Sequence, residues 1–281
     1  MNKNTILFLM MIFSPFIYAQ EEDLLEEIET TTETGFIPPA FKGLQIVTGQ
    51  STKLASKGDL YSVVAHRFGD VSQGFDNFFG LDNASTKIGF IYGLTDNLSL
   101  SLSRETLLKT YEGGIKYRIA KQSENFPVEI VGYNVLAVNS DLSKDDYPGL
   151  KFSNRLSYLS QALVSRRFSE SFSLQFSPSF VHKNLYEPKE EEKDQFLTGL
   201  GGRYKLSKRI SVNTEYFVNF SNSSIYKNPF SLGLDIETGG HVFQLLFSNS
   251  RFNSDIGYLT NASGNWGKGN VFFGFNLYRV F

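Results

Sequence analysis

The chain has 281 residues, a formal net charge of −2 at pH 7 and no cysteine. The lack of cysteine excludes a disulfide scaffold, a thiolate metal site and a lipoprotein anchor, and the near-neutral charge argues against a nucleic-acid partner. The chain is rich in aromatic residues, with 27 Phe and 14 Tyr, yet its mean hydropathy is slightly polar at −0.20. Membrane-spanning barrels combine these properties because lipid-facing apolar residues alternate with polar lumen residues.

The first 20 residues have the pattern of a secretory signal peptide. Lys3 supplies the positive start, residues 6–17 form a short apolar core, and Ala19 offers a small residue for cleavage. This run is too short for a membrane-spanning helix, and no later run approaches about 18 apolar residues. A mature protein embedded in a membrane would therefore have to span it as a closed β-barrel.

Residues 21–58 are expected to precede the barrel. Residues 21–33 are strongly acidic, and we interpret them as a solvated periplasmic tail. Residues 35–58 are poorly patterned and contain one short strand-like piece, Leu44 to Thr48. We expect this segment either in the barrel lumen or at the barrel edge, and the sequence leaves both alternatives open.

Residues 59–281 are predicted to form an all-β fold, a transmembrane antiparallel up-and-down β-barrel of about 12 strands. The expected strands are residues 59–68, 84–93, 98–108, 110–120, 127–139, 154–167, 172–184, 195–206, 210–220, 229–237, 241–249 and 270–281. Short turn-like links alternate with longer polar links, and only the link near Lys109 breaks this rule. Short periplasmic turns and long external loops are typical of outer-membrane barrels.

The last strand is expected to close the barrel. Bulky side chains at its odd positions should face lipid, while Asn276 and Tyr278 should face the lumen. Pairing with the strand that begins at Asp59 would leave the sheet without an open edge. The expected partners are outer-membrane lipid, lipopolysaccharide, and the barrel-assembly machinery, which would recognise the strand that ends at Phe281.

Charged residues on the inward-facing positions are the candidate functional residues. They are Arg104, Glu112, Lys116, Arg118, Arg203, Glu215 and Asp235. We expect Arg104 to lie opposite Glu112, and Glu215 to lie opposite Asp235 with Arg203 one strand away. Inside a barrel, such charges either neutralise one another in a structural network or line a water-filled path.

The histidines do not indicate a metal site or an enzyme. His66 and His182 are expected near the external end and His241 near the periplasmic end, roughly 25 Å away at the rise of a strand. In its hairpin, a two-residue turn should place Ile236 opposite His241 and Asp235 opposite Val242, so that His241 faces outward at the membrane interface. His182 could serve as a base for Ser177 or Ser179, but those serines should point to the opposite face, and no nucleophile-elbow motif is present. No catalytic residue, metal or cofactor is therefore predicted.

Several blocks of the sequence resemble a known family. They are His66–Asp70, Gly80–Ala84, Asp235–Gln244, and Gly274–Asn276 together with Arg279–Phe281. Together they resemble an outer-membrane β-barrel family of Gram-negative bacteria that is classed only as a domain of unknown function. The resemblance runs from about Phe41 to the C-terminus and implies the same fold and location. It implies no activity, substrate or catalytic residue.

The leading functional hypothesis is a narrow passive pore or transporter for small solutes, lined by the seven charged residues. The first alternative is a plugged barrel with a structural, anchoring or partner-binding role. The second is a lipid-modifying enzyme at the outer face. The choice depends above all on whether residues 35–58 occlude the lumen.

Overall fold

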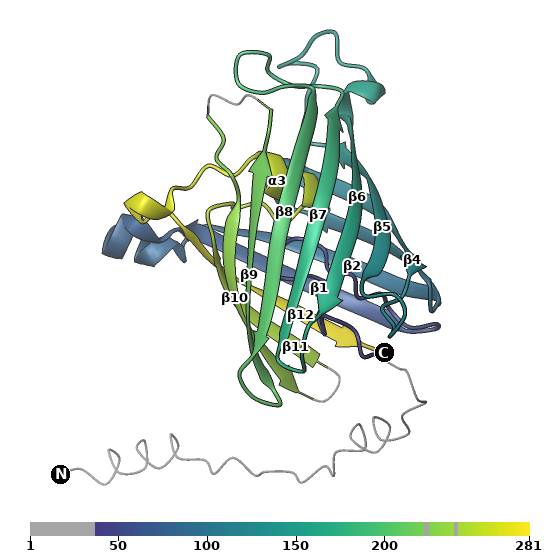
Figure 1. Ribbon diagram of the computed structural model, residues 1–281. Helices are drawn as coiled ribbons and strands as arrows, with labels where there is room; N and C mark the ends of the chain where they lie inside the picture. The colour runs from purple at the N-terminus through teal and green to yellow at the C-terminus, as the bar shows by residue number, and fades with distance from the viewer. Residues whose placement is uncertain (1–36, 222–224, 239–240) are drawn as a thin grey trace, which may run out of the picture. The chain divides into compact units, whose positions relative to one another are not determined.

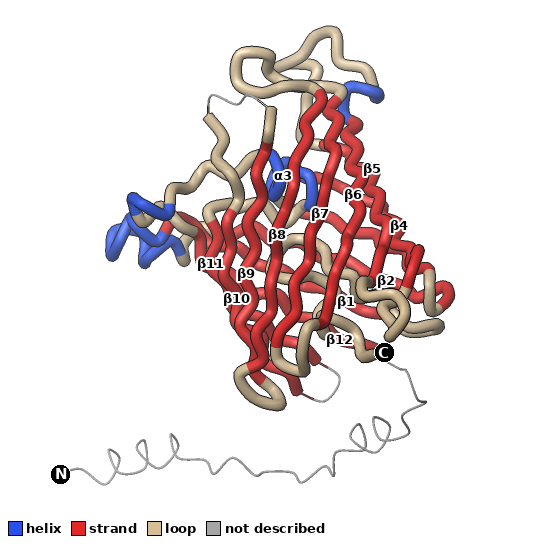
Figure 2. Tube along the Cα trace, viewed as in Figure 1, coloured by secondary structure: helices blue, strands red, loops and turns tan. Residues whose placement is uncertain are grey.

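Twelve antiparallel strands form one closed barrel (Figures 1 and 2). The computed structural model describes residues 37–221, 225–238 and 241–281. The expected signal peptide, the acidic tail and the Gly239–Gly240 turn lie outside these residues. The prediction of a twelve-stranded up-and-down barrel is confirmed.

The observed strands match the predicted ones to within a few residues. They are β1 (Leu60–Asp70), β2 (Ala84–Thr95), β3 (Leu98–Glu105), β4 (Thr110–Ala120), β5 (Glu129–Asn139), β6 (Leu156–Arg167), β7 (Phe172–Lys183), β8 (Asp194–Lys205), β9 (Ile210–Asn219), β10 (Phe230–Thr238), β11 (His241–Ser248) and β12 (Phe272–Val280). The third strand is shorter than expected because the chain turns through the 3₁₀ segment η2 (Leu107–Lys109).

The barrel closes where β12 pairs with β1. Tyr61 lies opposite Val280 and Ala65 lies opposite Asn276, in antiparallel register. All other strands pair with their neighbours in the chain. Each strand therefore has a hydrogen-bonded neighbour on both sides, which removes the open edge that lipid would not tolerate. The predicted role of the last strand is confirmed.

The two faces of each strand differ because apolar and polar residues alternate along it. In β7, lumen-facing residues such as Ser173 and Gln175 are buried, whereas Phe176 is 50 % exposed on the outer face. In β12, Asn276 and Tyr278 are buried in the lumen, as predicted. The outer face forms an apolar belt, which is the surface expected of a barrel in contact with lipid.

Short segments and loops connect the strands. Links of a few residues join β2 to β3 and β8 to β9 at one end of the barrel, here called the short-turn end. The opposite, long-loop end carries the 3₁₀ segments η1 (Val71–Gly80), η3 (Phe152–Arg155) and η4 (Trp266–Lys268) and the helix α3 (Asp255–Thr260). Within the described ranges, no helix is long and apolar enough to span a membrane.

The register of the β10–β11 hairpin differs from the expected one. His241 lies opposite Thr238, and Asp235 lies opposite Gln244. The sequence predicted Ile236 opposite His241 and Asp235 opposite Val242. The observed pairing moves each partner by two positions, which preserves the face of every side chain because the strand period is two. Asp235 therefore still points into the lumen.

We predict that a charge in the middle of the outer face destabilises the barrel. Phe176→Arg should lower the free energy of unfolding in lipid bilayers by about 2–4 kcal/mol, the cost of Arg near a bilayer midplane. Phe126→Arg is the control, because Phe126 is 40 % exposed and lies in the β4–β5 turn outside the strands. Denaturant titration, read by the different gel mobility of folded and boiled protein, measures both values. Equal losses for the two variants would contradict a lipid-facing β7.

Candidate functional site

Residues 40–57, here called the lumen segment, enter and leave the barrel at its short-turn end. At the entry, Lys42 Nζ lies 3.1 Å from Glu237 Oε2, and at the exit the Lys57 N–H donates to Asp96 Oδ1 over 3.0 Å. Between them the chain folds into a tight hairpin, closed by a 2.8 Å hydrogen bond from Ile46 N to Gly49 O. The structure thus decides the alternative that the sequence left open: the segment fills the lumen.

Glu215 on β9 binds the tip of this hairpin. Its carboxylate accepts backbone hydrogen bonds from Val47, Thr48 and Gly49 at 3.3, 2.7 and 2.9 Å. Hydrogen bonds to an ionised acceptor are stronger than neutral ones, and the side chain is 1 % exposed. A Cβ atom on Gly49 would lie 2.9 Å from Glu215 Oε2, so glycine is what allows this close approach.

Wall side chains also satisfy the carbonyl groups of the lumen segment. Lys116 on β4 donates to the carbonyls of Leu44, Ser51 and Lys53 at 3.1, 3.0 and 3.3 Å. Three wall amides donate to further carbonyls of the segment. Gln244 donates to Ile46, Asn276 to Val47 and Gln175 to Gln50. A buried backbone without strand neighbours needs such partners, so the polar wall compensates for the missing sheet contacts.

A second inserted segment reaches the lumen from the long-loop end. Asn253 and Ser254 lead into helix α3, which begins at Asp255 and lies among the strands near that end (Figure 1). Glu105 on β3 accepts the backbone N–H groups of Asn253 and Ser254, and Glu112 on β4 accepts that of Asp255 at 2.8 Å. The wall thus holds both inserted segments in one way, through carboxylates that bind backbone N–H groups.

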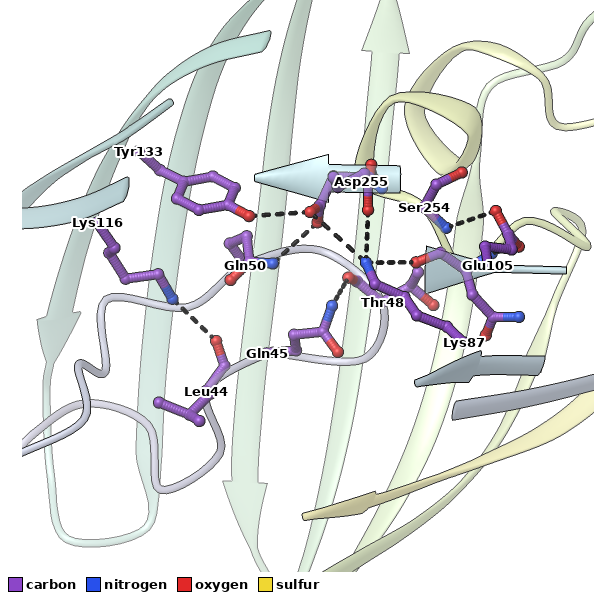
Figure 3. A network of polar contacts seen from close by, with 12 residues as sticks. Leu44, Gln45, Thr48, Gln50, Lys87, Glu105, Lys116, Tyr133, Ser254 and Asp255 are labelled. Carbon is purple, nitrogen blue, oxygen red and sulfur yellow. Dashed lines mark hydrogen bonds and ion pairs between the residues drawn. The ribbon is translucent and has the colours of Figure 1, made fainter. Parts of the chain in front are cut away.

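Asp255 connects the two inserted segments (Figure 3). Its carboxylate accepts hydrogen bonds from Gln50 Nε2 at 2.8 Å and from the Tyr133 hydroxyl at 2.9 Å. Lys87 Nζ lies 2.7 Å from Glu112 and 3.8 Å from Asp255. A single buried network therefore joins the lumen segment, the loop before α3 and the wall of β2–β5.

Tyr258 connects α3 to the wall beside Glu215. Its hydroxyl lies 2.9 Å from Oγ of Ser231, the residue opposite Glu215 in the register of β9 and β10. Burial and the Glu215 charge raise the pKa of Tyr258 well above its usual value. The phenol therefore keeps its proton at neutral pH.

Apolar packing anchors α3 more strongly than it anchors the hairpin. Ile256, Tyr258 and Leu259 belong to a buried cluster on the lumen face of β5–β9, and Leu54 is the member that the lumen segment contributes. The hairpin itself packs in two smaller clusters, around Phe41 and around Leu44. The hairpin and α3 therefore occupy the lumen at two different depths.

Space remains between the lumen segment and strands β1–β4, here called the wall cavity. It has a volume of about 50 Å³. Small lumen-facing residues such as Gly89, Ser99, Ser101 and Ser103 make room for it. Basic, acidic and apolar side chains complete its lining.

Six of the seven charged residues singled out from the sequence point into the barrel. Glu112, Lys116 and Glu215 contact the inserted segments directly, as described above. Asp235 accepts a hydrogen bond from Gln244, the amide that donates to the lumen segment. Arg118 pairs with Glu129 at 2.7 Å near the short-turn end. Whether these residues line a path for solutes remains a prediction.

The prediction for Arg104 is wrong. Its side chain is exposed on the outer face, where its guanidinium carbon lies 5.4 Å from the centre of the Tyr111 ring. Arg104 lies opposite Tyr111, and Ser103 lies opposite Glu112. Because alternate residues share a face, the lumen-facing charge on this strand is Glu105, which the sequence analysis missed.

The expected pairing of Glu215 with Asp235 is also wrong. Glu215 lies opposite Ser231, and Asp235 lies opposite Ser211, four residues further along the strand. Arg203 forms its ion pair with Glu237, at 3.1 Å, rather than with either carboxylate. The hydrophobic alternation fixes the face of a strand but leaves its register free to shift by two residues.

Several residues that hold the inserted segments were not predicted. Lys87 and Gln175 could have been found, since both lie in phase with inward serines on their strands. Asp255 lies in a loop with no periodic pattern, so the sequence carries no signal for its position.

The histidines lie on the outer face. The His66 ring stacks on Phe275 with centroids 5.4 Å apart, and His182 Nδ1 lies 2.6 Å from Asp194 Oδ1. Ser177 and Ser179 are buried in the lumen, on the opposite face of β7 from His182, as expected. Among the described residues, no three His, Cys, Asp or Glu side chains are grouped to hold a metal ion.

Comparisons with known proteins agree with this architecture. Residues 41–281 match the family model described as "Membrane bound beta barrel domain (DUF5777)". The search of curated proteins found no match. Among solved structures, the NanC porin superimposes with a TM-score of 0.50 at 10 % identity, over 78 % of this chain and 97 % of the porin. The COG4313 outer membrane channel from Pseudomonas putida F1 gives a TM-score of 0.47 at 14 % identity, over 82 % and 98 % of the two chains.

We predict that Glu215 controls the docking of the hairpin tip. Glu215→Ala removes the acceptor of three backbone hydrogen bonds and should cost at least about 4.5 kcal/mol of docking stability, since bonds to charged groups contribute about 1.5–3 kcal/mol each. Hydrogen exchange of the Val47, Thr48 and Gly49 amides should then accelerate roughly 1000-fold or more, at about 1.4 kcal/mol for each factor of ten. Nuclear magnetic resonance of the protein in detergent measures the rates.

Glu105→Ala is the matched control. It should accelerate exchange at Asn253 and Ser254 and leave the tip amides protected, because Glu105 binds only the second inserted segment. Unchanged protection at the tip in Glu215→Ala would contradict the role of Glu215.

Proposed function

The chain belongs to this family of membrane-bound β-barrel domains, and we propose that it is a narrow outer-membrane pore for small solutes that the lumen segment closes. The observation that carries the proposal is the polar contact between the lumen segment and the barrel wall. The wall holds the hairpin by hydrogen bonds that Glu215 accepts and that Lys116, Gln175 and Asn276 donate. The described state is the closed one.

The polar contact makes release of the hairpin feasible. When the hairpin leaves, water can replace the hydrogen bonds, whose net contribution is about 0.5–1.5 kcal/mol for a neutral pair and about 1.5–3 kcal/mol when one group is charged. The apolar cluster that anchors α3 offers no such exchange, since exposing apolar surface costs about 25 cal/mol per Å². We therefore assign the moving role to the hairpin and the fixed role to α3.

The open path would run along β2–β4. The lumen-facing residues there include Gly89, Ser99, Ser101 and Gly114, which leave more room than the apolar cluster of β5–β9 that packs against α3. Charged side chains at both ends of this path, such as Lys116 and Glu112, would then face water. A polar, hydrated lining is what a pore for hydrophilic solutes requires.

A second candidate is a permanently plugged barrel with a structural or partner-binding role. The link from Gln50 to Asp255 favours it, because this hydrogen bond joins the two inserted segments into one buried network. The two candidates differ in one measurable property, which is whether the lumen segment ever leaves the wall.

We predict that a disulfide across the hairpin tip abolishes conductance. A Cβ atom on Gly233 would lie 3.2 Å from Val47 Cγ2, close enough for the Cβ atoms of a Val47→Cys/Gly233→Cys pair to approach disulfide geometry. The chain has no other cysteine, so the bond would be unique. Conductance in planar bilayers should show brief openings for the wild type and at least tenfold fewer for the oxidised variant.

Reduction of the disulfide and each single-cysteine variant serve as controls, and both should open as often as the wild type. Equal conductance of the oxidised and reduced double variant would show that the hairpin does not close the path. No openings in any sample, including Glu215→Ala, would favour the plugged barrel.

A further inference from the structure

The wall cavity carries an excess of positive charge. Four basic side chains line it, Lys53, Arg67, Lys87 and Lys116, against two acidic ones, Glu112 and Asp255. Lys87 contacts both acidic groups, and these three side chains together leave one negative charge. The other three basic side chains outweigh it and set the sign of the field in the cavity.

Arg67 on β1 is a buried cation without an anionic partner. Its guanidinium is 1 % exposed and donates to neutral acceptors, among them Asn276 Oδ1 at 2.9 Å and Thr48 Oγ1 at 3.1 Å. Its Nε has no hydrogen-bond partner, and no carboxylate lies within 4 Å of the guanidinium among the residues that the structure describes. A buried charge of this kind is costly unless something compensates it.

Lys116 and Lys53 add two further charges of the same kind. Lys116 Nζ contacts three backbone carbonyls, and in the described part of the chain neither ammonium lies within 4 Å of a carboxylate. Burial and, next, the charge of Arg118 lower the pKa of Lys53. A bound anion beside Lys53 would favour the charged form of its ammonium group and so counteract both effects on the pKa.

The rest of the cavity lining is apolar or weakly polar. Leu44, Leu54, Val63 and Ile91 provide apolar surface, and the serines of β3 provide hydroxyl groups. A ligand that fits this lining has a single negative group and a small apolar body. Concave sites with mostly apolar walls and a few directed polar groups are typical of small-molecule sites.

We propose that the wall cavity binds small organic monoanions, such as carboxylates, with the anionic group beside Lys53 and in the field of Arg67 and Lys116. The proposal deepens the proposed function, since such anions would be the preferred solutes of the pore. Binding itself does not require conduction, so the two claims can fail separately.

Isothermal titration calorimetry with the folded protein in non-ionic detergent tests the proposal. The probes are benzoate and benzamide, which share size and shape and differ in charge. Benzoate should bind saturably, and benzamide should bind at least tenfold more weakly. Equal affinities for the two probes, or no heat from benzoate with a barrel of verified gel mobility, would overturn the proposal whatever the conductance.

Lys53→Gln, Lys57→Gln and Ser103→Leu locate the site. Lys53→Gln should weaken benzoate binding about tenfold, because a charge a few ångströms from the anion is only partly screened in the lumen. Lys57→Gln should have no effect, since Lys57 is exposed and lies outside the cavity lining. Ser103→Leu should fill the cavity and abolish binding. An equal loss in both lysine variants, or full binding in Ser103→Leu, would place the anion elsewhere.

Discussion

The lumen segment depends on one constraint, which is that every polar group of its buried backbone needs a partner. A barrel strand meets this requirement through its neighbours, but residues 40–57 run through the lumen without a strand beside them. Glu215 accepts hydrogen bonds from the N–H groups of the hairpin tip, and Lys116 donates to three carbonyls of the lumen segment. A buried polar group without a hydrogen-bond partner costs about 1–3 kcal/mol. The segment can therefore follow only a path along which charged wall side chains meet its backbone groups.

The two sides of the lumen wall pack differently. On β5–β9 an apolar cluster packs against α3, among inward polar residues such as Gln175 and Glu215. On β2–β4 the inward residues are mostly small or charged, and they leave the wall cavity beside the hairpin. The first side provides a fixed core for the barrel, and the second provides hydrated surface once the hairpin moves. This division is what makes a closable path compatible with a stable barrel.

The two inserted segments come from opposite ends of the barrel and meet in its middle. The hydrogen bond from Gln50 to Asp255, the first residue of α3, carries the connection. A change at the start of α3 would therefore alter the contacts of the lumen segment, and a change in the segment would alter those of α3. The network offers a physical route by which an event at the long-loop end reaches the short-turn end.

The sequence was sufficient for the barrel and for most of the lumen-facing charges, because both follow from local alternation. Where that alternation was set aside, the prediction failed. Arg104 was expected in the lumen opposite Glu112, although Ser99, Ser101 and Ser103 place the even positions of that strand outside. Following the same count would have identified Glu105.

Periodicity alone could not decide the strand register or the contents of the lumen. A shift by an even number of residues, here four, changes every partner and leaves every face unchanged, which is why Glu215 and Asp235 were wrongly placed opposite each other. The lumen segment has no strand period to interpret, and Thr48 meets Glu215 across 167 residues of chain. By itself the sequence determined a closed barrel with a polar interior, since alternation is a property of each strand. Only the tertiary structure decided what fills that interior, because the contacts that hold the lumen segment form between residues far apart in the chain.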